Sequence, residues 1–258
     1  MDPLLTIITV TRNDADRLSK TIRSLKAYYD ETKFEHVVMD GGSTDSTNQL
    51  IQPLENVINF KFYSEVDGGI YDAMNKGVQR SAGKYIIFLN SGDCMLIRPE
   101  QLSSWLEDVG DASNADIMCF PFTQVDNDFS KLVQPQNAGP YRMPTSHQAM
   151  IFLADFVRAC PYDMRYKIAA YYDLYMRADK SRIFIAPMVL SLTAVEIDGV
   201  ASSSPVESYK EYLSIAFRNC HGLERLACLI RIGSKALFVI LLKSILTKPL
   251  VQWLRRVA

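Results

Sequence analysis

The stretch Ser64–Asp93, SEVDGGIYDAMNKGVQRSAGKYIIFLNSGD, decides the fold class of this 258-residue chain. Its pattern predicts a strand end, an acidic turn with two glycines, a helix over Ile70–Arg80, a strand over Tyr85–Leu89 and a second acidic turn. Polar residues directly after a buried strand suit the carboxyl edge of an α/β sheet, where such folds bind ligands. We therefore expect a ligand site at Glu65–Gly69 and Asn90–Asp93.

The residues before this stretch show the same alternation of strands and helices. Leu4–Val10 is a continuous apolar run, typical of a buried parallel strand, and a helix over about Asp16–Tyr29 follows it. His36–Met39 and Lys61–Ser64 predict two more strands, which the glycine turn Asp40–Thr47 and a short helix separate. This order predicts a mostly parallel α/β sheet flanked by helices.

The pattern beyond Pro99 is less regular. It predicts helices to about Val109 and over Tyr171–Ala178 and strands near Asp116–Phe122, His147–Leu153, Arg182–Ile185 and Val189–Val195. It also predicts a loop or a hairpin at Asp126–Pro144 and a loop at Asp198–Pro205. From there to the end the pattern is helical. We expect one domain at residues 1–205 and a helical, amphipathic tail at residues 206–258.

The composition excludes some classes of protein. The formal net charge of −1 gives no support for nucleic-acid binding. The five cysteines are scattered and form no CxxC pair, so neither a zinc site nor a disulfide framework is indicated. The N-terminal sequence MDPLLTIITVTRND has no basic segment before its apolar run. We therefore expect no signal peptide and a cytoplasmic protein.

Four polar features follow strands or occupy loops in this interpretation: Asp40, Glu65–Gly69, Asn90–Asp93 and His147. Carboxylates and asparagine are hard oxygen ligands, which suit Mg²⁺ or Mn²⁺ bridging a diphosphate. Each feature also has a purely structural explanation, since aspartate caps helices, glycine pairs form turns and a single histidine often only packs. All four in order along one chain are more specific than any one alone.

Five motifs together resemble the inverting family 2 glycosyltransferases of the GT-A fold: ITVTRND, VVMDGGSTDST, SEVDGGIYDAMNKG, FLNSGD and SHQAMIF. The resemblance covers about residues 4–200 and is nearest to enzymes of bacterial exopolysaccharide clusters, such as the colanic-acid type. It implies transfer of a sugar from a UDP-sugar or GDP-sugar to a glycan or a lipid-linked glycan. It also implies Mn²⁺ or Mg²⁺ as cofactor.

The resemblance assigns a role to each of these positions. The donor-binding set is Thr9, Thr11, Asn13, Asp40, Glu65, Asp67, Gly69, Asn75, Lys76 and Asn90, with Asp93 on the metal and His147 near the diphosphate or the acceptor. In such a reaction a metal stabilises the departing diphosphate, and one carboxylate takes the proton of the acceptor hydroxyl.

One position departs from the family's pattern. The family's base is an aspartate downstream of the HQ motif, and here Tyr171 stands at that position. Tyrosine, with a pKa of about 10, is a poor base at neutral pH. Asp173 is the nearest carboxylate, but two residues along a helix turn a side chain by about 200°; Asp163 is a further candidate. We hypothesise that residue 171 faces the acceptor and that transfer is weakened, while a packed Tyr171 with the base elsewhere stays open.

The C-terminal sequence is apolar and basic. Its longest uninterrupted apolar run, Ala236–Leu242, is shorter than the roughly 20 residues that span a bilayer. Basic amphipathic helices bind membrane surfaces, and Trp253 beside Arg255 and Arg256 suits the interfacial depth. We expect peripheral attachment to the inner face of the cell membrane. Packing on the first domain or a contact in a homo-oligomer is the alternative.

Two other functions compete with transfer. A non-catalytic nucleotide-sugar-binding or scaffold relative in a polysaccharide assembly complex would tolerate Tyr171. A nucleotidyltransferase shares the strand–helix alternation and the metal. It should carry a glycine-rich, basic phosphate loop after the first strand, and the sequence TVTRNDAD that follows this strand is not one.

Overall fold

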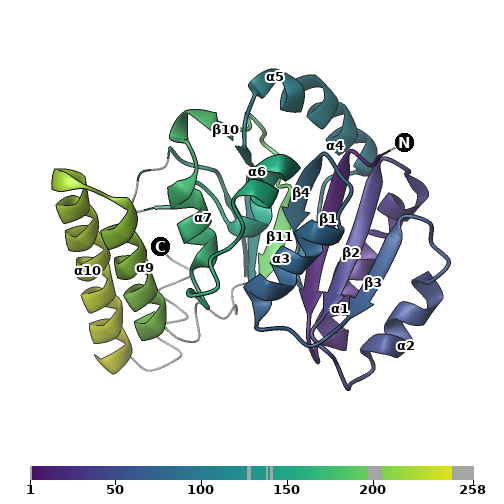
Figure 1. Ribbon diagram of the computed structural model, residues 1–258, viewed down its shortest axis with the longest axis horizontal. Coiled ribbons are helices and arrows are strands. Elements are labelled where there is room, and N and C mark those ends of the chain that lie inside the picture. The colour runs from purple at the N-terminus through teal and green to yellow at the C-terminus, as the bar shows by residue number, and fades with distance from the viewer. Residues whose placement is uncertain (1, 127–128, 138, 140–141, 197–204, 246–258) are drawn as a thin grey trace.

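The computed structural model describes residues 2–126, 129–137, 139, 142–196 and 205–245, shown in Figure 1. A seven-stranded sheet has the order β10-β6-β9-β4-β1-β2-β3. Its strands are β1 (Leu5–Thr11), β2 (Phe34–Asp40), β3 (Phe60–Ser64), β4 (Tyr85–Phe88), β6 (Ile117–Cys119), β9 (Met150–Leu153) and β10 (Ile183–Ile185). All neighbours are parallel except β9, which runs antiparallel between β4 and β6. The predicted mostly parallel α/β sheet is confirmed.

Helices cover both faces of this sheet. They are α1 (Ala15–Ser24), α2 (Thr47–Ile51), α3 (Ile70–Arg80), α4 (Pro99–Trp105), α5 (Asp111–Ser113), α6 (Ala154–Ala159), α7 (Ala170–Arg177), α9 (Pro205–Asn219) and α10 (Gly222–Ile245). Side chains of α3, α6 and α7 share one core cluster with one face of the sheet, and those of α1 and α4 lie against the other face. A Cβ on Gly77 of α3 would lie 2.7 Å from Ile8, so glycine permits this close helix–sheet contact.

Several predicted bounds needed correction. The helix predicted to Tyr29 ends at Ser24 and continues as a 3₁₀ turn, Lys26–Asp30. The strand predicted over Asp116–Phe122 is two strands, because Pro121 lies between β6 and β7 (Phe122–Asp126). Helix α6 was not predicted. The predicted loop at Asp198–Pro205 and the residues around Trp253 lie outside the described residues, apart from the start of α9.

A second, four-stranded sheet of order β5-β11-β7-β8 was not predicted as such. It adds β5 (Cys94–Met95), β8 (Phe129–Val133) and β11 (Thr193–Glu196) to β7. The hairpin of β7 and β8 fulfils one of the two options for the segment after Asp126, whereas β11 is shorter than the predicted strand. This sheet matters for the site because β11 brings Glu196 beside Asp93, which ends the turn after β4.

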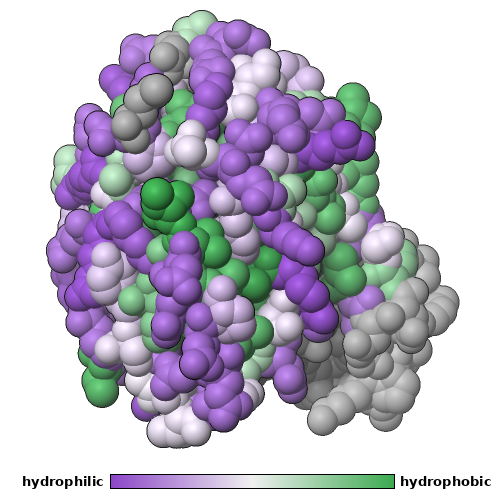
Figure 2. Space-filling model, turned by 90° about the vertical axis from the view of Figure 1, so that its right-hand side faces the viewer, coloured by the Kyte–Doolittle hydropathy of each residue, from purple (hydrophilic) through white to green (hydrophobic). Residues whose placement is uncertain are grey.

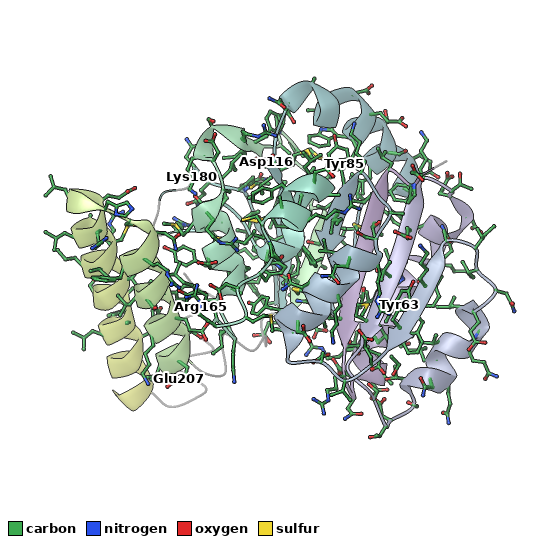
Figure 3. The ribbon with its side chains drawn as sticks, viewed as in Figure 1. Tyr63, Tyr85, Asp116, Arg165, Lys180 and Glu207 are labelled. Atoms are coloured by element: carbon green, nitrogen blue, oxygen red, sulfur yellow. The ribbon has the colours of Figure 1, made fainter. Side chains whose placement is uncertain are left out.

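The two C-terminal helices pack side by side at one end of the molecule, with α9 against α7 (Figure 1). The Glu211 carboxylate on α9 accepts backbone N–H groups of Ile168 (2.9 Å) and Ala169 (2.7 Å), just before α7. Lys180, labelled in Figure 3, donates to the carbonyl oxygen of Tyr175 (2.7 Å) at the other end of α7. Both ends of α7 are therefore fixed, with charges that complement its dipole.

Within residues 2–245 where the structure is described, no helix has both the length and the apolarity needed to cross a bilayer.

Candidate active site

The carboxyl ends of β1, β2 and β3 lie abreast. Thr11 pairs in register with Asp40, and Asp40 pairs with Ser64. Thr9 lies two residues further inside the sheet, fully buried, with its hydroxyl 3.0 Å from Nε2 of His36. The structure thus brings Thr11 and Asp40 to the sheet edge and leaves Thr9 in the core.

A hydrogen-bond network joins the turns after β1 and β2. Asp40 is 1% exposed, and its carboxylate accepts hydrogen bonds from Ser43 N–H (3.0 Å) and the Ser64 hydroxyl (2.6 Å). Asn13 has a left-handed backbone (φ 49°); its N–H donates to Ser43 Oγ (2.7 Å), and its side-chain oxygen accepts from Thr44 N–H (2.8 Å). These bonds build a rigid polar wall at the carboxyl edge.

The acidic turn before α3 forms the neighbouring wall. Asp67 accepts the N–H of Gly69 (2.9 Å), and its second oxygen would lie 2.7 Å from a Cβ on Gly41. Lys76 Nζ lies 3.6 Å from Glu65 and donates to the carbonyl oxygen of Val66 (3.2 Å). Glu65 and Lys76 therefore shape this turn, and Asp67 lies over the glycine turn that follows β2.

Buried polar atoms without partners among the described residues lie in the turn after β4 and at the end of β1. They are the side-chain oxygens of Asn90, in the turn, and of Thr11, the last residue of β1. Asp93 is 3% exposed, and its carboxylate accepts the N–H of Glu196 at 3.2 Å. Burial raises the pKa of Asp93 to about 7. Unpartnered buried acceptors and a desolvated carboxylate mark a place that a polar ligand would complete.

Two cations lie against this turn. Gly92 has φ 97°, and a Cβ on it would lie 2.5 Å from Nε of Arg17 in α1. The Arg17 guanidinium is 3.1 Å from the Glu196 carboxylate, and Lys20 Nζ is 2.9 Å from it. Glycine is required here for the backbone angle and for the guanidinium that occupies the space of a side chain.

The residues of this turn fit a divalent cation in part. Among the residues that the structure describes, no three His, Cys, Asp or Glu side chains are grouped as a metal site. Asp93 and the free oxygen of Asn90 nevertheless supply two hard oxygens in one turn. A cation beside Asp93 would offset the desolvation that raises its pKa. Diphosphate oxygens and water would have to complete the coordination, as is usual for Mg²⁺.

His147 lies on the other side of the sheet edge and is 7% exposed. Its Nε2 is 2.6 Å from the Tyr162 hydroxyl, and its ring stacks on Phe88 with centroids 5.2 Å apart. Burial lowers the pKa of His147 to about 3, so the ring is neutral at physiological pH. The side-chain amide of Asn75 binds the backbone of Tyr162 twice. Its oxygen accepts the Tyr162 N–H (2.9 Å), and its nitrogen donates to the Tyr162 carbonyl oxygen (3.0 Å). The structure thus places Asn75 behind His147 and not at the edge formed by the ends of β1, β2 and β3.

Tyr171 and Asp173 point in different directions from α7. Tyr171 is half-buried, and its hydroxyl pairs with that of Tyr212 on α9; burial raises its pKa to about 12. Asp173 is 2% exposed and accepts hydrogen bonds from Arg177 Nε (2.8 Å) and Asn219 Nδ2 (3.4 Å). The structure therefore does not bring Asp173 to the place of Tyr171, as the helical rotation requires.

A cavity of about 550 Å³ adjoins Tyr171. It is lined by Phe122, Gln124, Val133, Gln134, Gln136, Arg142, Met143, Pro144, Thr145, Ser146, Tyr171, Val195, Glu196 and Lys235. Of these residues only Glu196 carries a carboxylate. Because Glu196 also contacts Asp93, the cavity borders the turn after β4. A ligand at the sheet edge and a second ligand in the cavity would meet beside Glu196.

The chain matches the family model described as Glycosyl transferase family 2 over residues 6–167. The chain belongs to glycosyltransferase family 2. An uncharacterized glycosyltransferase of Mycobacterium tuberculosis is 38% identical over 91 residues, a match that spans 35% of this chain and only 34% of that relative. The "PGL/p-HBAD biosynthesis glycosyltransferase" of Mycobacterium bovis is 24% identical over 267 residues, covering 98% of both chains.

Solved structures confirm the fold of this family 2 glycosyltransferase. Staphylococcus aureus TarS 1-349 in complex with UDP-GlcNAc is similar with a TM-score of 0.68 and 18% identity, over 89% of this chain and 71% of that chain. The mannosyltransferase PcManGT of Pyrobaculum calidifontis, in complex with GDP-Man and Mn²⁺, has a TM-score of 0.61 and 14% identity, over 99% and 79%. The expected GT-A architecture is therefore confirmed.

Sequence reasoning missed four side chains at the site of this family 2 glycosyltransferase: Arg17, Lys20, Glu196 and Tyr212. Arg17 and Lys20 read as an exposed basic pair on an amphipathic helix. Glu196 follows a strand in the sequence, and that position was the available signal. Tyr212 lies in the tail that we separated from the first domain, although it packs against the main core cluster.

Proposed function

We propose that this glycosyltransferase moves a sugar, with inversion, from a nucleoside diphosphate sugar to a glycan or lipid-linked glycan in bacterial polysaccharide or glycolipid synthesis. The observation that carries the proposal is the turn after β4, which packs against Arg17 at Gly92 and holds the unpartnered oxygen of Asn90 and the desolvated carboxylate of Asp93. The unpartnered hydroxyl of Thr11 ends the neighbouring strand β1. Family membership supports the reaction class. The nucleotide sugars named with TarS and PcManGT support the donor class.

The donor half would use the sheet edge. Asp40 and Asn13 offer a polar wall for the base, and the free oxygens of Thr11 and Asn90 suit ribose hydroxyls. Asp93 would hold Mn²⁺ or Mg²⁺, which when bound supplies positive charge to the diphosphate. Arg17 lies where its guanidinium can exchange Glu196 for the diphosphate oxygens. Asp67 and Gly69 close the edge from the side of α3.

The acceptor half would use the cavity. An acceptor hydroxyl must attack opposite the leaving diphosphate, and a carboxylate must take its proton. Glu196 is the carboxylate among the described lining residues, and it is already ion-paired with Arg17 and Lys20. Tyr171 stands at the cavity with a pKa of about 12 and cannot accept a proton at neutral pH. We therefore propose transfer that works but is weakened.

We further propose that α10 attaches the enzyme to the inner face of the cytoplasmic membrane. Leu223, Leu226, Ile230 and Leu237 follow helical spacing and are 56–86% exposed, with Arg225 and Arg231 nearby. The face at the β3 end is by contrast mostly hydrophilic, although hydrophobic side chains gather near its centre (Figure 2).

An Ile230→Asp, Leu237→Asp double variant should lose flotation with anionic vesicles. Ile58→Asp, at a still more exposed apolar site elsewhere, should keep it. Dimerisation through α10 without flotation would contradict the proposal.

Thermal shift tests the donor proposal directly. UDP, GDP and their sugars, each with and without Mn²⁺, should raise the unfolding temperature for one base, and Asn90→Ala should reduce that shift. Transfer or donor hydrolysis with Mn²⁺ then distinguishes an enzyme from the alternative, a non-catalytic nucleotide-sugar-binding relative, which Tyr171 favours. Binding without any turnover would support that alternative. No shift with any nucleotide would contradict donor binding itself.

A further inference from the structure

The cavity beside Tyr171 carries two cationic side chains, Arg142 and Lys235. Arg142 lines it from the segment after β8, and Lys235 lines it from α10. Among the described residues, neither makes an ion pair, whereas the single carboxylate of the lining, Glu196, is already paired with Arg17 and Lys20. The lining therefore has an excess of positive charge that an anionic ligand would compensate.

The rest of the lining divides into a polar and an apolar part. Gln124, Gln134 and Gln136 offer amides to hydroxyl groups, and Phe122, Met143 and Pro144 offer apolar surface. Lys235 belongs to the same helix as the exposed apolar residues of α10, and Phe238, which is 62% exposed, follows it by one helical turn. A ligand bound at Lys235 thus lies beside a surface suited to a lipid chain.

We propose that the acceptor is a lipid-linked sugar whose phosphate joins sugar and lipid, and that Arg142 and Lys235 bind this phosphate. The inference rests on the proposed transferase function and names its acceptor class. The sugar would lie toward Glu196, which borders the donor turn, and the lipid would leave along α10. A neutral glycolipid would leave both cations uncompensated, and a soluble sugar phosphate would leave the apolar surface beside Lys235 unused.

Binding to the nucleotide-saturated enzyme tests this inference. With the donor site filled by whichever of UDP or GDP stabilises the protein, farnesyl diphosphate, farnesol and inorganic diphosphate are titrated below the micellar range. Farnesyl diphosphate should bind about tenfold more tightly than either of the others, because a charge-assisted contact and apolar burial act together. Arg142→Gln and Lys235→Gln should each remove about tenfold of its affinity while farnesol binding stays unchanged.

Matched variants keep the test decisive. Lys235→Arg should retain the preference, and Lys210→Gln, which removes an α9 lysine paired with Glu207 outside the cavity, should leave every affinity unchanged. Equal affinity for farnesol and farnesyl diphosphate would overturn the proposal, as would glutamine variants that keep the preference. Equal affinity for inorganic and farnesyl diphosphate would overturn the lipid-linked class in favour of a soluble phosphate acceptor. Failure of the transferase function would show separately, as the absence of nucleotide stabilisation.

Discussion

The proposed donor half and the proposed acceptor half of the site are built in different ways. The donor half comes from turns that directly follow β1, β2, β3 and β4, and its side chains fix one another, as Asp40 does with Ser43 and Ser64. The acceptor half is a cavity assembled from a hairpin, α7, β11 and α10. There the cations Arg142 and Lys235 have no ionic partner among the described residues.

This contrast indicates where specificity resides. A preformed polar wall suits one ligand chemistry, because its groups pay little ordering entropy on binding. A cavity lined from separate elements can change its occupant through a few side chains. We expect substitutions in the donor half to reduce activity with every acceptor, whereas substitutions in the acceptor half should discriminate among acceptors.

The largest effect is expected in the donor half. Asp93→Asn removes the one carboxylate of the turn after β4, so turnover should fall by about 100–1,000-fold, as for loss of a group that stabilises developing charge. Thermal shift should at the same time lose its dependence on Mn²⁺. Asp155→Asn, at an exposed carboxylate on α6, is the matched control and should leave both unchanged. Full metal dependence in Asp93→Asn would show that the cation binds elsewhere.

A smaller effect is expected where the halves meet. Glu196→Gln removes the carboxylate that borders both, and turnover should fall by about 100-fold, as for loss of a general base. Donor affinity should not fall, since Arg17 loses a competitor for the diphosphate. Isothermal titration with the nucleoside diphosphate measures donor affinity separately from turnover. A variant that loses donor affinity as much as turnover would place Glu196 in the donor half alone.

The sequence predicts local features of this structure better than contacts between residues that are distant in the chain. Helix α3 has the predicted bounds Ile70–Arg80, because its apolar spacing and glycine turn are contiguous in the chain. The contact of Glu196 N–H with Asp93 joins residues 103 positions apart through a second sheet, so no local pattern predicts it. The start of α1 also depends on a residue distant in the sequence. The Ala15 N–H donates to the Asp45 carboxylate and not to the adjacent Asn13 or Asp14.

Side-chain roles were harder to predict than positions. Asn75 lies within the motif that resembles the donor site, yet its amide holds the backbone of Tyr162. Thr9 lies in the motif ITVTRND, yet it is two residues inside the end of β1, and its hydroxyl contacts His36 in the core. A motif identifies a segment that meets the site, and the depth along the strand or the helical rotation decides which of its side chains reach it.

A gain of activity is expected at position 171. Tyr171→Asp places a carboxylate in the first turn of α7, where the helix dipole stabilises its ionised form, and it lines the acceptor cavity. Turnover should rise by about tenfold, with donor affinity unchanged. Tyr171→Phe removes only the hydroxyl that bonds Tyr212 and should give no gain. If the aspartate variant is folded but no faster, the base lies elsewhere and the wild-type enzyme is not impaired.

The smallest effect concerns stability and the two buried histidines, His36 in β2 and His147 just before β9. Burial lowers the pKa of His36, which contacts Thr9 and Tyr29, and that of His147 to about 3, below the unfolded value of about 6.5. The unfolded chain therefore binds more protons between these values, so these residues make stability fall as the pH drops from about 6.5 toward about 3. Each histidine contributes a slope of up to about 1.4 kcal/mol per pH unit. Urea unfolding of the wild type and of His36→Gln at pH 7.0 and below measures this slope. The free energy of unfolding should fall less steeply with decreasing pH in the variant. Equal slopes in the two proteins would mean that His36 is already protonated or solvated in the folded state.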